Sequence, residues 1–164
     1  MIRPESNWYP SPNFTPQDPG RTITCVIVHA TAASKAQGSL EWMCDPKSKV
    51  SAHYLIDTDG TLWHLVHEQN LAWHAGESMF NGLSNVNHFS IGIELVNPND
   101  GKTTYPEPQL SKLAELVTAI CQEHKILTKA VVGHADIAPG RKNDPLCFPW
   151  DVFRAMLQNL GVAA

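Results

Sequence analysis

Residues Thr22 to Val28 form an almost uninterrupted run of β-branched and apolar side chains. A strand with one face in water alternates polar and apolar residues, whereas a continuous apolar run is typical of a strand buried on both faces. Such a strand needs other elements packed against both sides of its sheet, and with the helices expected later in the chain it indicates the α/β or α+β class, of which we favour α/β. The run ends on His29, so we expect an imidazole at the carboxyl end of a buried strand.

The other apolar patterns predict the elements that surround this strand. In chain order they are a short helix over 39–44, a β-hairpin over 52–56 and 61–66, strands over 90–96 and 130–133, and amphipathic helices over 108–124 and 150–160. In the last helix we expect Val152, Phe153, Met156, Leu157 and Leu160 to point inward. Residues 71–87 are rich in Gly, Asn, Ser, Trp and His and show neither the helical nor the strand periodicity of apolar residues. They predict a long surface loop. The expected fold is a central mixed β-sheet flanked by helices, with a functional cleft at the strand ends.

Length, charge and apolar patterning limit the classes of protein to which this chain can belong. The 164 residues suit one domain over 1–164, in which 1–20 form an extended lead. The net charge of −4 gives no positive field for nucleic acid. The lead has no signal-peptide core, and no apolar run approaches the roughly 20 residues of a membrane-spanning helix. We therefore expect a cytoplasmic protein without integral membrane association. We also expect a monomer.

Cysteine usage agrees with a reducing compartment. The cysteines are Cys25, Cys44, Cys121 and Cys147, and no two of them form a C-x-x-C pair. Such a spread predicts free thiols rather than a disulfide framework or a cysteine-only zinc site.

Two histidines stand where chemistry is favoured. His29 and His134 each follow a predicted buried strand, and the carboxyl ends of neighbouring strands are common places for sites in α/β sheets. Two histidines and one carboxylate form a catalytic zinc set that leaves a fourth position open for water. Spacing alone leaves open whether the carboxylate is Asp136 or Asp144, and whether His53, His74, or the pair His64 and His67 are ligands instead.

Five strings of the sequence resemble the type 2 N-acetylmuramoyl-L-alanine amidases, in that family's order. They are Val26–Thr31 (VIVHAT), Val50–Ile56 (VSAHYLI), Ala72–Gly76 (AWHAG), Ser90–Glu94 (SIGIE) and Gly133–Pro145 (GHADIAPGRKNDP). The resemblance extends from Ser11 to Trp150. Within this family the sequence most resembles the muropeptide-recycling and periplasmic bacterial amidases. Phage amidase endolysins and peptidoglycan recognition proteins share the fold that the resemblance implies.

The resemblance implies a role for several residues. It implies one Zn²⁺ per chain on His29, His134 and Asp144, with Glu94 as the catalytic glutamate and Lys142 as the cation that stabilises the oxyanion. Asp136 is then structural. Where the family has glycine after Asp-Pro, this chain has Leu146 and then Cys147, which puts the local shape of the metal loop in question.

The cleft must hold a sugar and a short peptide. We expect Trp73, His74, Asn87 and Arg141 to contact that substrate. The tryptophans expected in the core are Trp42, Trp63 and Trp150.

The implied activity is zinc-dependent hydrolysis of the amide bond between the lactyl group of N-acetylmuramic acid and L-alanine. The substrate is then peptidoglycan or a muropeptide, for cell-wall degradation, recycling or phage lysis. If the chain is a phage endolysin, we expect it to be released to the cell wall. The alternative is a peptidoglycan-binding module of the same fold without catalysis, against which the complete ligand set argues. A zinc peptidase is disfavoured because no H-E-x-x-H motif is present. A glycosidase, with Glu94 and an aspartate as its carboxylate pair, leaves both histidines without a role.

Overall fold

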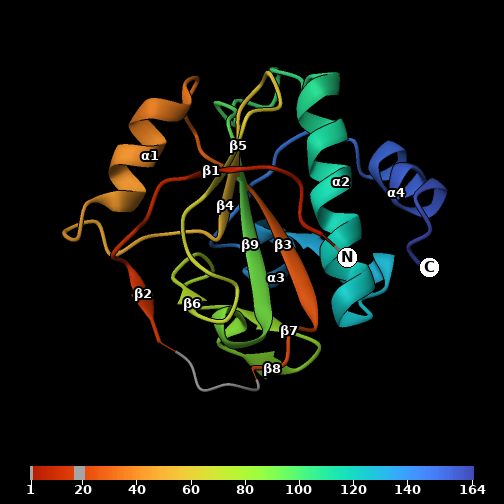
Figure 1. Ribbon diagram of the computed structural model, residues 1–164, viewed down its shortest axis with the longest axis horizontal. Coiled ribbons are helices and arrows are strands. Elements are labelled where there is room, and N and C mark those ends of the chain that lie inside the picture. The colour runs from red at the N-terminus through yellow and green to blue at the C-terminus, as the bar shows by residue number, and fades with distance from the viewer. Residues whose placement is uncertain (1, 17–20) are drawn as a thin grey trace.

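The computed structural model describes residues 2–16 and 21–164, and the rest of the predicted lead, residues 1 and 17–20, lies outside the described residues (Figure 1). Its centre is a six-stranded sheet of order β1-β5-β4-β9-β3-β10. The strands are β1 (Asn7–Trp8), β3 (Cys25–Ala30), β4 (Tyr54–Ile56), β5 (Leu62–His64), β9 (Ser90–Leu95) and β10 (Val131–Gly133). The neighbours β4, β9, β3 and β10 are parallel, whereas β5 is antiparallel to β4. The predicted mixed α/β sheet is confirmed.

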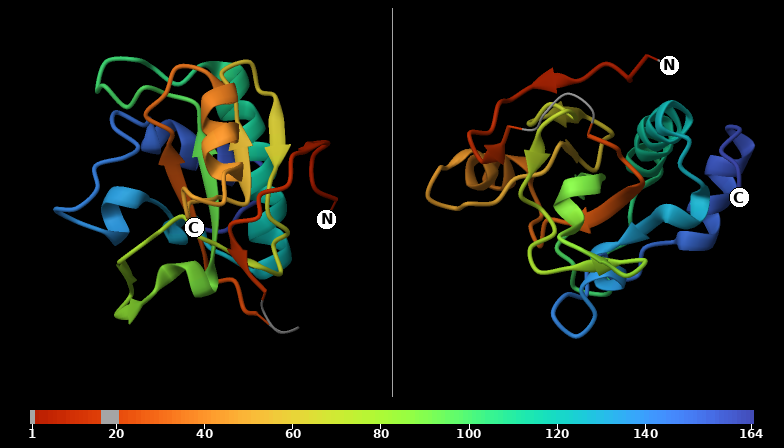
Figure 2. Two further views of the ribbon diagram at one scale, coloured as in Figure 1. Left: turned by 90° about the vertical axis from the view of Figure 1, so that its left-hand side faces the viewer. Right: turned by 90° about the horizontal axis from the view of Figure 1, so that it is seen from below.

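Helices cover both faces of this sheet (Figures 1 and 2). On one face α2 (Glu107–His124) and α4 (Trp150–Asn159) pack on Val26, Val28, Ile91 and Ile93. On the other face lie α1 (Ala36–Cys44) and α3 (His134–Ile137), against apolar clusters that include Leu55 and Ile27. Successive side chains of a strand point to opposite faces, so His29 of β3 points away from α2.

The longest helix, α2, is fixed to the sheet at its first turn. Pro108 lies in that turn, where its missing N–H costs nothing, and Lys125 ends the helix with a left-handed φ of 58°. The buried Gln109 donates from Nε2 to the carbonyls of Ile56 at 3.0 Å and Val96 at 3.1 Å. These bonds tie α2 to the chain just where β4 and β9 end.

The predicted loop over 71–87 is wrong in part, because this segment contains short paired strands. β6 (Leu71–Ala72) pairs with β2 (Phe14–Thr15), and β7 (Met79–Phe80) pairs with β8 (Leu83–Ser84). A 3-10 helix, η1 (Val86–Phe89), follows. The hairpin turn is Asn81–Gly82, with φ of 50° and 80°. Both residues thus have the positive φ of a type I′ turn, which Asn-Gly favours.

Two side chains predicted to point inward from the last helix are exposed instead. Phe153 and Leu157 are buried and Met156 packs beside them, but Val152 is 57% and Leu160 48% exposed. Phe153 and Leu157, one turn apart, define the inward stripe. Val152 lies outside this stripe, and Leu160 lies just beyond Asn159, where the helix ends. Among the described residues, no helix is long and apolar enough to cross a membrane. The cysteines are free thiols, as predicted.

An ion-pair network fastens the start of the chain to the sheet. Arg3 donates from Nε and Nη2 to the two carboxylate oxygens of Glu68 at 2.7 and 2.6 Å, and the Tyr54 hydroxyl donates to the same carboxylate at 2.6 Å. Burial alone would raise the pKa of Glu68, but the bonds from Arg3 and Tyr54 outweigh it and lower this pKa to about 2.

Replacing Arg3 tests this anchor. Arg3→Met should lower the free energy of unfolding by about 1.5–3 kcal/mol near neutral pH, the range for hydrogen bonds to charged groups. Because the folded pKa of Glu68, about 2, lies below its usual 4.5, this stabilisation is present above pH 4.5 and is lost as the pH falls toward 2. Urea unfolding at neutral pH and at about pH 3 measures both effects.

The control is Lys129→Met, which removes one cation from an exposed position. It should change stability little at either pH. An Arg3→Met deficit that is equally large at both pH values would show that Glu68 is not the group through which Arg3 acts.

Candidate metal centre

The residues named by the resemblance as metal ligands converge at the carboxyl ends of two adjacent strands. β3 and β10 are parallel with Val28 opposite Gly133, so the next residues, His29 and His134, meet at the same edge. Their Nδ1 atoms lie 3.0 Å apart. Asp144, from the loop after α3, brings its Oδ2 to 3.5 Å from His29 Nδ1 and 3.3 Å from His134 Nδ1. Among the described residues, these are the only group of histidine, cysteine and carboxylate side chains close enough to hold a metal ion.

The spacing and the protonation of this group fit a divalent metal. With metal–ligand distances of 2.0–2.1 Å, the ligand atoms of a tetrahedral site lie about 3.3 Å from one another. Burial lowers the pKa of His29 to about 4, so its imidazole is neutral. His134 Nε2 lies 3.1 Å from the Ala75 carbonyl, to which it can only donate, and its Nδ1 lone pair therefore faces the site.

Glu94 stands directly beside this group. It is the partner of His29 in the β3–β9 register and is directed to the same face of the sheet. Its Oε2 is buried without a hydrogen-bond partner among the described residues. Burial, with the nearby charge of Asp144, raises the pKa of Glu94 to about 8 against the opposing charge of Lys142. Glu94 as a whole is half-buried. A carboxyl with one buried oxygen and a strongly raised pKa beside a metal site is a candidate for proton transfer.

A cavity of about 980 Å³ opens beside the triad. Its walls include Trp73, His74, Asn87 and Arg141, which the sequence predicted as substrate contacts, together with Glu94 and Lys142. Substrate contact by the first four stays a prediction, and each of their side chains already hydrogen-bonds to another part of the protein.

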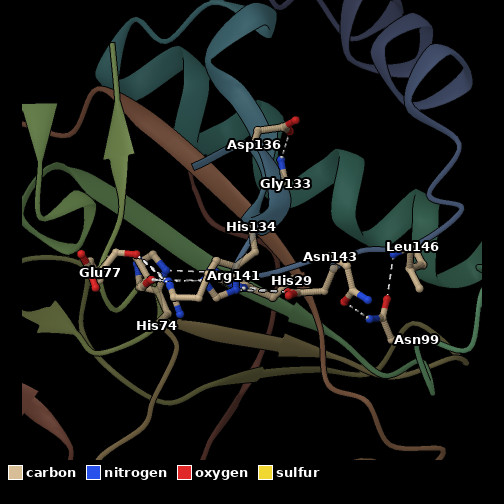
Figure 3. Close-up of polar contacts among 12 residues, drawn as sticks. His29, His74, Glu77, Asn99, Gly133, His134, Asp136, Arg141, Asn143 and Leu146 are labelled. Atoms are coloured by element: carbon tan, nitrogen blue, oxygen red, sulfur yellow. Dashed lines mark hydrogen bonds and ion pairs between the residues drawn. The ribbon is translucent and has the colours of Figure 1, made fainter. Parts of the chain in front are cut away.

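The polar groups on that wall hold one another in place (Figure 3). Asn87 Oδ1 accepts the backbone N–H groups of His74 at 3.2 Å and Ala75 at 2.8 Å. Arg141 donates from Nη2 to the carbonyls of Ala75 and Glu77, each at 2.6 Å. The loop that carries Arg141 is therefore attached to the 74–77 segment at the rim.

Trp42 was predicted in the core, and this is wrong. It is 58% exposed and lines the cavity. The buried stripe of α1 runs through Ala36, Leu40 and Met43, and Trp42 lies about 100° around the helix from Met43. Trp63 and Trp150 are partly buried and pack against the core, as expected. The helical spacing of Ala36, Leu40 and Met43 in the sequence could have shown that Trp42 lies outside the buried stripe.

The alternative ligands have other partners. Asp136 Oδ2 accepts the Gly133 N–H at 2.8 Å, which makes it a local backbone cap (Figure 3). His53 accepts the Gly92 N–H on Nδ1 at 3.0 Å, and its Nε2 contacts the Asn70 carbonyl at 3.1 Å. His64 and His67 lie together around Trp8. None of these side chains faces the triad.

The metal loop is held on both sides of Asp144 by one side chain. Asn99 accepts the Leu146 N–H on Oδ1 at 2.7 Å and donates from Nδ2 to Asn143 Oδ1 at 3.1 Å (Figure 3). Cys147 is exposed, with its Sγ 3.3 Å from the Gly101 carbonyl. Leu146 and Cys147 are therefore accommodated by the 97–101 loop, and no cysteine joins the triad.

The fold and the site together define a class: an α/β protein with a two-histidine, one-carboxylate centre that opens onto a substrate-sized cavity, as in hydrolytic zinc enzymes. Comparison with known proteins gives the family. The family model described as N-acetylmuramoyl-L-alanine amidase matches residues 19–147, and the chain belongs to this family.

Curated relatives and a solved structure agree. The 1,6-anhydro-N-acetylmuramyl-L-alanine amidase AmpD of Escherichia coli (strain K12) is 33% identical over 168 residues, with 90% of each chain covered. The N-acetylmuramoyl-L-alanine amidase AmiD of the same strain is 38% identical over 143 residues, which are 78% of this chain and 51% of AmiD. A structure of AmiD from E. coli in complex with the substrate anhydro-N-acetylmuramic acid-L-Ala-D-gamma-Glu-L-Lys superposes with a TM-score of 0.78 at 34% identity, covering 90% of this chain and 62% of that one.

The raised pKa of Glu94 makes a prediction about stability. A carboxyl with a folded pKa of about 8 and an unfolded pKa near 4.5 destabilises the fold progressively as the pH rises between those values. Glu94→Gln removes this cost. The metal-free variant should therefore be more stable than metal-free wild type above pH 8, by on the order of 1 kcal/mol or more, and nearly equal to it near pH 4.

Thermal or urea unfolding in the presence of a chelator measures the difference. Glu5→Gln, at an exposed position, is the matched control and should show no such trend. A Glu94→Gln variant that is less stable than wild type at every pH would mean that the carboxylate has a stabilising partner in solution.

Proposed function

We propose that this chain is a zinc-dependent amidase that hydrolyses the bond between the lactyl group of N-acetylmuramic acid and L-alanine. The observation that carries the proposal is the triad of His29, His134 and Asp144 beside Glu94, at the wall of one cavity. Oε2 of Glu94 is buried and has no hydrogen-bond partner in the described part of the chain. The names of the relatives support the bond, because each describes an amidase of the muramyl–L-alanine linkage. The complete ligand set favours catalysis over a binding module.

His29, His134 and Asp144 would hold the metal ion. Two imidazoles and one carboxylate are a common catalytic zinc set, and zinc so bound supplies Lewis acidity that lowers the pKa of a bound water to about 7 and polarises a carbonyl. The chain itself supplies the other groups. Their geometry determines where protons and charge go.

Glu94 is the proposed general base. Its pKa of about 8 lies near the operating pH, where a proton acceptor and donor is most effective. It takes a proton from the attacking water and delivers it to the departing amine of L-alanine. Lys142 lines the same cavity and carries the positive charge that stabilises the oxyanion of the tetrahedral intermediate.

The substrate class follows from the cavity and the relatives. Trp73 and Trp42 both line the cavity and offer aromatic faces for a sugar and a peptide stem, and Arg141 of the same lining is the proposed partner of a peptide carboxylate. The relative that aligns over nine tenths of both lengths is named for the 1,6-anhydro sugar. We therefore favour soluble anhydro-muropeptides over intact wall. The single domain, the monomeric state and the cytoplasmic location stay predictions from the sequence.

Metal binding tests the cofactor. The purified protein should bind one zinc ion and lose activity when a chelator removes it. His29→Ala should abolish tight binding because it removes one of three ligands, whereas His64→Ala, which lies away from the triad, should bind as wild type does. Elemental analysis after gel filtration measures the stoichiometry. Metal-free protein with full activity would contradict the proposal, and zinc retained by His29→Ala would point to other ligands.

The bond that is cut tests the activity. Incubation with anhydro-muramyl tripeptide should release peptides that begin with L-alanine, and digestion of sacculi should create no new reducing ends. Glu94→Gln should be slower by about 10²-fold or more, since it lacks the base, while it keeps the triad. Amino-terminal analysis and a reducing-sugar assay on the same digest give both readings. New reducing ends without new amino-terminal alanine would show glycosidase activity instead.

A further inference from the structure

The ring of His74 is buried between a metal ligand and the sheet. Its Nδ1 lies 3.0 Å from His29 Nε2, and its Nε2 lies 3.2 Å from the Ser90 hydroxyl. Ser90 Oγ in turn lies 2.7 Å from the Val86 carbonyl. These contacts form one line from the Val86 carbonyl through Ser90 and His74 to the imidazole of His29. Nδ1 of His29 lies beside the other two members of the triad, and Figure 3 shows His29 near His74 and His134.

The direction of every hydrogen bond in this line can be deduced from its end. The Val86 carbonyl can only accept, so the Ser90 hydroxyl donates to it. The oxygen of Ser90 then accepts from His74 Nε2–H. The ring of His74 is buried, and among the described residues its two nitrogens contact only the imidazole of His29 and the hydroxyl of Ser90. A charged ring would be a buried charge without an anionic partner, so the ring is neutral and carries a single N–H. His74 Nδ1 is therefore an acceptor.

The same elimination fixes the tautomer of His29. Because His74 Nδ1 accepts, His29 Nε2 must carry the hydrogen and donate across the 3.0 Å separation. The lone pair of His29 is then on Nδ1, which is the atom that lies with His134 Nδ1 and Asp144 Oδ2. The next residue in the chain, Ala75, fixes His134 in the same way through its carbonyl.

Packing leaves His74 little freedom to turn. A Cβ built on Gly92 would lie 2.4 Å from Cγ of His74 and 2.6 Å from its Nδ1, so the ring rests directly on the backbone of β9. Any side chain at position 92 would displace it. The backbone N–H groups of residues 74 and 75 both donate to Asn87 Oδ1, which holds the segment from the other side.

We propose that His74 is a positioning residue of the metal centre: together with Ser90 it holds His29 as the Nε2–H tautomer, with Nδ1 free to bind the metal. The inference rests on the proposed zinc function. Groups that orient a ligating histidine contribute about 10- to 100-fold to metal affinity or activity. In this chain the orienting group is a neutral imidazole anchored on a serine and a backbone carbonyl.

Zinc affinity separates this role from simple packing. His74→Leu fills the space without an acceptor and should bind zinc about 10- to 100-fold more weakly than wild type. His74→Asn places an amide oxygen near the position of Nδ1 and should recover most of that loss. His64→Leu is the matched control and should bind as wild type does. Competition with a chromophoric chelator measures affinity, and circular dichroism checks that each variant is folded.

A spectroscopic readout tests the tautomer directly. In ¹H–¹⁵N spectra of the zinc-loaded wild type, His29 should show a proton on Nε2 that is protected from exchange with water, and His74→Leu should lose this protection. If His74→Leu does not fold, Ser90→Ala takes its place. It removes one neutral hydrogen bond from the line and should weaken zinc binding about fivefold.

The outcomes separate the proposed zinc function from the proposed role of His74. Wild-type protein that binds no zinc overturns the proposed function. Wild-type protein that binds zinc, with His74→Leu and Ser90→Ala of unchanged affinity, overturns only the role of His74. A proton found on His29 Nδ1 in the zinc-loaded wild type overturns it as well.

Discussion

The pairing of β3 with both of its parallel neighbours is the constraint on which the site depends. Its register sets His29 beside Glu94 on one side and Val28 beside Gly133, one residue before His134, on the other. A shift of one residue in β3 would turn His29 toward α2 and put apolar side chains into the cleft. The packing of Val26 and Val28 under α2 therefore also determines the direction of the catalytic face.

The sequence predicted the parts of this arrangement that depend on local pattern. The continuous apolar run before His29 indicated a strand covered on both faces, and the structure buries every residue of β3. The elements at 108–124 and 90–96 were placed within one residue of their observed limits. Motif order then gave the family, which the comparison confirms. The position of His29 and His134 at the ends of predicted strands indicated that they could lie together. Spacing did not decide between Asp136 and Asp144 as the third ligand, and the resemblance to the family implied Asp144.

The features of the site that could not be predicted from the sequence depend on contacts between distant segments. Asp136 and Asp144 are both near His134 in the chain, and only the path of the loop, held by Asn99 from another strand end, turns Asp144 to the triad. The bonds of His74 to His29 and Ser90 join three separate segments. Trp42 was assigned to the core on hydrophobicity alone, although its helix buries a different stripe. Residue type indicates the chemistry that a side chain can perform, whereas tertiary structure determines which groups it contacts.

The charge around the triad explains why a neutral group orients His29. Orienting partners of metal-bound histidines include carboxylates as well as carbonyls and waters. A carboxylate in the place of His74 would add a buried negative charge next to Asp144 and Glu94, whose pKa burial and the charge of Asp144 already raise to about 8. Like charges in a low-dielectric site disfavour ionisation further, so Glu94 would be less able to act as the base that we propose it to be. The imidazole of His74, backed by Ser90 and Val86, directs His29 through hydrogen bonds that carry no net charge.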